Sequence, residues 1–83
     1  MKKYLVDVYI PAIERHFDVY LPETKLVSEA AVLIAGLAES IAGEYYRKSP
    51  NPLLLDAKTG ESLYPDFTVR NAGVQNASRL ILL

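Results

Sequence analysis

The stretch Ser78–Leu83 reads "SRLILL", and every position from Leu80 onward is apolar. A β-strand normally buries one face and exposes the other, because successive side chains point to opposite sides. This strand therefore either lies buried on both faces or keeps its outer face for a partner. A central position beside the first strand of the chain would cover both of its edges.

The composition is that of a small globular domain. With 83 residues, 51% of them hydrophobic and 23% charged, the chain is expected to form one domain over residues 1–83. A net charge of −1 argues against nucleic-acid binding, which needs a basic surface. The lack of cysteine excludes disulfides and suits a reducing cytosol. No targeting segment is visible, and the apolar run over residues 30–38 is about half of the ~20 residues that cross a bilayer. A cytoplasmic protein without direct membrane insertion is expected.

Two alternating stretches predict an N-terminal hairpin. In Lys3–Ile10, every second residue from Tyr4 is apolar, which is the period of a half-buried strand. "PAIER" breaks the pattern, and residues 16–21 resume it with Phe17, Val19 and Leu21 inward. His16, Asp18 and Tyr20 are then expected to point outward.

A helical period follows from Lys25, with Thr24 as the expected N-cap and the prolines of residues 49–52 as the stop. The inward stripe is expected to comprise Val27, Ala30, Ala31, Ile34, Leu37, Ala38, Ile41 and Tyr45. Leu26, Val32, Leu33 and Ala35 make the apolar surface wider than one sheet face should cover. Loops packed over the helix flank or a contact between two copies would explain this breadth.

The remaining elements are short. Leu53–Leu55 is expected to be a buried strand with Leu54 outward, Ser62–Tyr64 a brief return strand, and Arg79–Leu83 the last strand. The prediction is an α+β fold, a mixed sheet of four to five strands packed on one helix in the order ββαβ(β)β.

This order resembles the β-grasp, or ubiquitin-like, fold over essentially the whole chain. Phe17–Ala35, "FDVYLPETKLVSEAAVLIA", and Ala72–Leu83, "AGVQNASRLILL", resemble the YukD/EsaB family, the small ubiquitin-like proteins of type VII (WXG100) secretion systems in Gram-positive bacteria. Ala77 departs from that family, which often has glycine at this turn. The resemblance implies a cytoplasmic accessory or regulatory component whose partners are proteins, including membrane-embedded secretion components.

No residue pattern predicts catalysis, a cofactor or a metal site. His16 is the single histidine and is expected to be a solvated strand residue, and no cysteine or His/carboxylate cluster offers metal ligands. Ubiquitin and the sulfur carriers act through a C-terminal Gly-Gly, whereas this sequence ends in Leu82-Leu83. A sulfur-carrier or modifier-type β-grasp protein lacking that Gly-Gly is therefore the alternative function, and a self-assembling structural domain, such as a homodimer, is another.

An apolar surplus on the outward sheet face predicts the binding surface. If Leu80 and Leu82 face the helix, alternation turns their neighbours outward. The expected protein-binding residues are Leu5, Tyr9, Tyr20, Leu54, Ile81 and Leu83. A contiguous apolar surface of this kind typically marks an interaction site. The alternatives are that these residues are scattered without a role, or that the register is shifted by one residue, which would exchange the two faces.

Overall fold

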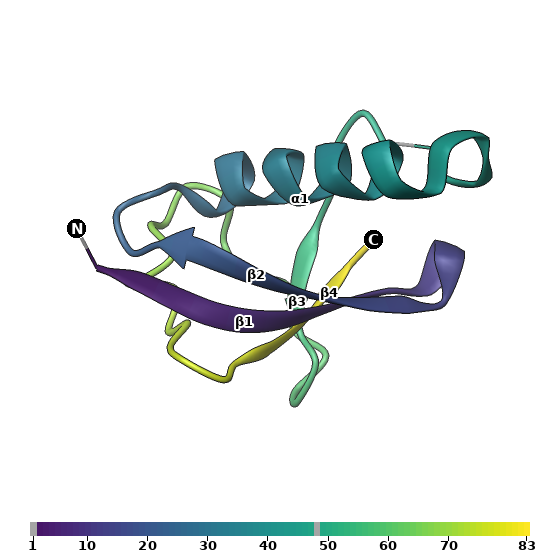
Figure 1. The fold of residues 1–83 in the computed structure, drawn as a ribbon. Coiled ribbons are helices and arrows are strands. Elements are labelled where there is room, and N and C mark those ends of the chain that lie inside the picture. The colour runs from purple at the N-terminus through teal and green to yellow at the C-terminus, as the bar shows by residue number, and fades with distance from the viewer. Residues whose placement is uncertain (1, 48) are drawn as a thin grey trace.

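The computed structural model describes residues 2–47 and 49–83. One helix, α1, packs on a four-stranded mixed sheet with the strand order β2-β1-β4-β3, as Figure 1 shows. This is the ubiquitin-like β-grasp fold that the order of elements predicts. The core lies between the sheet and α1.

The N-terminal hairpin is confirmed. β1 (Lys3–Ile10) pairs antiparallel with β2 (Arg15–Pro22) without a bulge in the register. A short 3₁₀ helix over Pro11–Ile13 and a left-handed Glu14, with φ of 51°, make the turn between them. The inward side chains of β1 are buried in the alternation that the sequence predicts, and they are Tyr4, Val6, Val8 and Ile10.

The last strand lies at the centre of the sheet, as predicted. β4 (Arg79–Leu82) runs parallel to β1 on one side and antiparallel to β3 (Leu54–Asp56) on the other. Leu80 and Leu82 point into the core and are only 2% and 1% exposed. Both edges of this most apolar strand are therefore covered by neighbouring strands.

The prediction for β3 is wrong in register. Leu54 is directly opposite Leu82 and only 2% exposed, so it lies in the core. Residues directly opposite each other in an antiparallel pair point to the same face, and the inward Leu82 therefore turns Leu54 inward. The expected return strand at Ser62–Tyr64 is reduced to a single bridge between Leu55 and Ser62. Pro65 follows at once and has no N–H to continue a ladder.

The helix is shorter at both ends than the sequence predicts. α1 spans Val27–Ala42, and Leu26, rather than Thr24, is its N-cap residue. The N–H groups of Val27 and Ser28 donate to the carbonyls of Phe67 and Pro65 at 2.8 and 3.1 Å, so a distant loop replaces a capping side chain. At the other end Gly43, with φ of 59° and ψ of −128°, closes the helix before the prolines.

The buried face of α1 differs from the predicted apolar stripe, because it is shifted around the helix toward the alanines. Ala35 is fully buried, whereas Leu37, Ile41 and Tyr45 are 44%, 52% and 83% exposed. Small side chains let the helix lie close to the sheet, and this turns the larger residues to its flanks. The buried face of α1 comprises Val27, Ala30, Ala31, Ile34, Ala35 and Ala38.

Candidate functional site

The outer face of the sheet is the side turned away from α1. Alternation places on it the strand residues between the buried ones, and the strand register sets them side by side. The outer face comprises Lys3, Leu5, Asp7, Tyr9, His16, Asp18, Tyr20, Pro22, Leu55, Arg79 and Ile81.

One apolar row crosses the sheet on this face. Tyr9 is opposite His16 on one side and beside Ile81 on the other, and Ile81 is opposite Leu55. The rings of Tyr9 and His16 are 4.6 Å apart at their centroids and tilted by 37°. Tyr9, Ile81 and Leu55 are each half-buried, so neighbouring side chains hold them in place while part of each remains open.

A charged row lies next to the apolar row. Asp7 is directly opposite Asp18 and beside Arg79 in the strand register. The Nδ1 atom of His16 lies 3.1 and 3.2 Å from the two carboxylate oxygens of Asp7, at a contact that solvent reaches. Two carboxylates directly opposite each other repel, and Arg79 is the cation that the strand register sets beside them.

A second apolar group lies beyond the charged row. Leu5 and Tyr20 are opposite each other and are 37% and 64% exposed. The turn after residue 75 fixes the backbone of Leu5, because its N–H donates to Asn76 Oδ1 at 2.9 Å and its carbonyl accepts from the N–H of Ala77 at 2.8 Å. A shallow hollow that these residues share with Asp7 and Arg79 lies here.

The structure therefore brings together most of the predicted binding residues, but not as one patch. Tyr9 and Ile81 share the apolar row, and Leu5 and Tyr20 form the second group. Leu83 is 55% exposed just past β4, where its N–H and carbonyl pair with Leu53. Leu54 is in the core, so its expected place on this face is wrong.

Sequence reasoning did not include Leu55 and His16 in this surface. His16 completes the apolar row through its contact with Tyr9, and Leu55 takes the outward position that had been expected for Leu54. Three leucines in succession carry no period, so the sequence holds no signal for which of them points outward.

Over residues 2–47 and 49–83, no group of three His, Cys, Asp or Glu side chains is arranged to hold a metal ion. The side chain of His16 is hydrogen-bonded to the carboxylate of Asp7. Acyl transfer would instead require a nucleophilic hydroxyl beside the imidazole. Burial raises the pKa of the Tyr46 phenol, and the negative charge of Glu39 adds to this, but Tyr46 belongs to the core.

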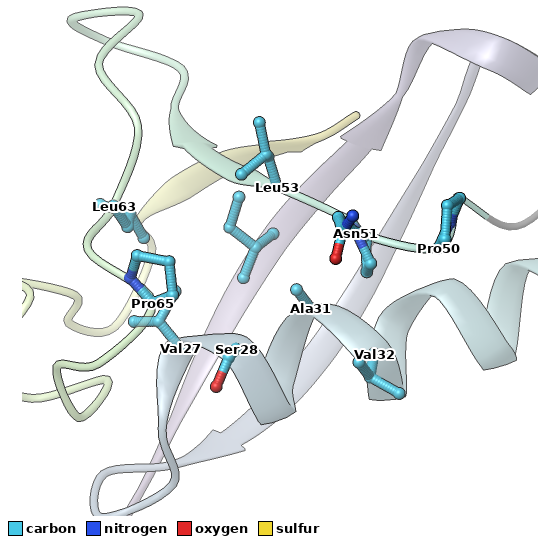
Figure 2. A pocket seen from close by; sticks show the side chains of 11 residues that line it. Val27, Ser28, Ala31, Val32, Pro50, Asn51, Leu53, Leu63 and Pro65 are labelled. Carbon is cyan, nitrogen blue, oxygen red and sulfur yellow. The ribbon is translucent and has the colours of Figure 1, made fainter.

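A hollow on the helix side is shown in Figure 2. It lies between α1 and the chain that leads into β3, with Val27, Ala31 and Val32 on one wall and Leu53 on the other. Ser28 and Asn51 are polar groups at its rim. Its volume is about 200 Å³. Small-molecule sites usually measure about 300–1,000 Å³, so this hollow suits an apolar side chain better than a cofactor.

Within the part of the chain that the structure describes, no helix has the length and apolar character needed to cross a bilayer.

No protein-family profile and no curated protein sequence matches this chain. Solved structures do share its fold. A chain of a toluene 4-monooxygenase HD complex with the inhibitor 4-bromobenzoate is 10% identical with a TM-score of 0.81, over 98% of this chain and 96% of that one. The EccD5 ubiquitin-like domain from Mycobacterium xenopi is 13% identical with a TM-score of 0.74, over 100% of this chain and 94% of that one.

A ubiquitin-like domain of an Arabidopsis thaliana protein has 21% identity and a TM-score of 0.69, over 100% of this chain and 78% of that one. Identities this low show a common fold and nothing about activity. The chain is therefore similar to ubiquitin-like domains in architecture.

Proposed function

We propose that this chain is a non-catalytic ubiquitin-like module that binds other proteins through the outer face of its sheet. The apolar row of Tyr9, Ile81 and Leu55 is the observation that carries the proposal, because it places solvent-accessible apolar groups side by side on three adjacent strands. Contiguous exposed apolar surface often marks a protein contact, and tyrosine is enriched at such contacts.

The charged row indicates the charge that the partner surface should carry. The charged row lies between the apolar row and the Leu5–Tyr20 group, and its two carboxylates outnumber its one arginine, Arg79. A matching surface would therefore present a basic side chain between two apolar ones. Such a pattern orients a partner as well as attracting it.

The cellular setting rests on the resemblance to the YukD/EsaB family. We propose a cytoplasmic accessory or regulatory role in a type VII secretion system, with a membrane-embedded component as partner. The EccD5 ubiquitin-like domain has the same fold, which is compatible with this setting. Genes for WXG100-type proteins and a membrane ATPase beside this gene would support it, and thiamine or molybdopterin genes would contradict it.

The test compares Ile81→Lys with Tyr64→Lys as affinity baits in the native host. Ile81 lies in the apolar row, whereas Tyr64 is 68% exposed in the loop after β3. Both changes should cost below about 1 kcal/mol in stability, because a lysine stem can lie along apolar surface with its charge in water. The wild type and Tyr64→Lys should retain the same secretion component, identified by mass spectrometry, and Ile81→Lys should lose it. Equal capture by all three would contradict the proposal.

A further inference from the structure

The free edge of β2 offers unpaired backbone groups. β2 is the outermost strand and pairs with β1 alone among the described strands. The N–H of Glu23 donates to the carbonyl of Lys2 at 3.0 Å, which fixes the odd-numbered residues as those bonded to β1. In an antiparallel ladder the backbone groups of His16, Asp18 and Tyr20 must then point away from β1. Pro22, at the end of the strand, has no donor. The other outward backbone groups of β2 have no strand partner among the described residues.

An apolar helix flank lies above the same edge. Leu33, Leu37 and Ile41 follow one another at intervals of four on α1 and are 44%, 44% and 52% exposed. Ile41 lines a hollow with residues 11–15 at the start of β2, whereas Val32, on the opposite side of the helix, lines the hollow beside Leu53. The flank therefore lies on the β2 side of the molecule. Figure 1 shows α1 running along β2.

Phe17 is the half-buried apolar side chain of the edge strand itself. It lies on the inward face of β2, half-buried against the core, and the Arg15 guanidinium carbon is 5.4 Å from its ring centroid. A strand added to this edge would cover Phe17 and bring apolar groups against the flank.

The side chains that would lie opposite each other favour one register for pairing with the β2 strand of a second copy. Opposite residues in an antiparallel pair point to the same face of the sheet. In a symmetric dimer the two-fold axis must therefore pass at a residue that lies opposite the same residue of the other copy. An axis at Asp18 would set its carboxylate against the same group of the other copy. An axis at Val19 would set His16 opposite Pro22, which has no N–H. An axis at Phe17 sets His16 of each copy opposite Asp18 of the other, so that the imidazole can donate a hydrogen bond to the facing carboxylate.

We propose that two copies of this chain associate through their β2 edges, antiparallel about a two-fold axis at Phe17. The two sheets then join into one, with both α1 flanks on the same side and both outer faces on the other. This contact uses the backbone edge of β2 and shares only the side chains of His16 and Asp18 with the outer face, so the apolar groups Tyr9, Ile81 and Leu55 stay open to another protein.

Sedimentation of the full chain over a wide concentration range, into the millimolar, is the first test. The mass should rise from the 9.2 kDa of one chain to twice that value. Asp18→Lys should weaken association by at least about tenfold, because each of the two contacts loses the carboxylate that accepts from His16. Its fold should be retained, since the new lysine lies opposite Asp7. Asp66→Lys makes the same charge change on an exposed loop and should leave association unchanged.

A mixing experiment tests the register. Asp18→Lys and His16→Asp should each self-associate weakly, yet an equimolar mixture should form a mixed dimer, because each edge then faces opposite charge. Circular dichroism checks that both variants are folded. A wild type that stays monomeric, a mixture that gains nothing, or a dimer broken by Ile81→Lys and unaffected by Asp18→Lys would each overturn the proposal.

Discussion

The adjacent leucines Leu53 and Leu54 provide the sharpest test of the sheet register. Leu54 is 2% exposed and opposite Leu82, whereas Leu53 is 43% exposed. Leu54→Ala removes three carbons from a buried site, for which the cost is about 2–5 kcal/mol. The hollow of about 200 Å³ beside Leu54 lets neighbouring groups relax. We therefore expect the lower part of that range, about 2–3 kcal/mol.

The matched change, Leu53→Ala, should cost about 1 kcal/mol, because only about half of that side chain is buried. Urea unfolding followed by circular dichroism gives both free energies. For a domain of this size, Leu54→Ala should lower the melting temperature by roughly 10–20 °C. The Leu54→Ala/Leu82→Ala double variant should be non-additive by about 0.5 kcal/mol or more, since the two side chains are neighbours. A cost for Leu53→Ala equal to or above that of Leu54→Ala would refute the register and the assignment of the outer face.

Three further predictions concern α1 and the core. Gly43→Ala should destabilise by about 1–3 kcal/mol, because φ of 59° with ψ of −128° strains any side chain. Gly36→Ala should stabilise by about 0.5–1 kcal/mol, since the added methyl meets no atom within 4 Å in mid-helix. Thermal unfolding measures both, and a stabilising Gly43→Ala would contradict the helix end. The pKa of Tyr46 is raised from 10.0, so its contribution to stability is present below that pH and is lost as pH rises through the folded pKa. In Tyr46→Phe, the unfolding free energy should therefore decrease less steeply as the pH is raised above 10 than it does in the wild type. An equally steep decrease in both proteins would contradict the raised pKa of Tyr46.

The sequence predicted those parts of the fold that depend on local periodicity. Strict alternation over Lys3–Ile10 specifies both the strand and its buried face, and the uniformly apolar Leu80–Leu83 indicates a central strand. The register of β3 could not be found in this way. Its three leucines are equivalent in sequence, and only pairing with Leu82 decides between them.

The limits of the helix and the shape of the site were also set by non-local contacts. Thr24 has the right chemistry for a cap, but carbonyls from residues 65 and 67 occupy the helix N–H groups instead. For the outer face, the sequence indicated Leu5, Tyr9, Tyr20 and Ile81. It did not show that Asp7 and Asp18, with Arg79, divide these residues into two groups, because the division follows from the pairing of three strands.

The capping of α1 by a distant loop has a consequence for the order of folding. Val27 and Ser28 depend on carbonyls some forty positions later, and the N–H groups of Val69 and Arg70 in turn donate to the carbonyls of Lys25 and Glu23 at 2.8 and 3.0 Å. The first helical turn therefore cannot be completed until the second half of the chain has been made and has docked. During synthesis on the ribosome, the helix start should remain frayed until residues 65–70 have emerged and docked. In native-state hydrogen exchange, the amides of Val27, Ser28, Val69 and Arg70 should open together, as one cooperative unit.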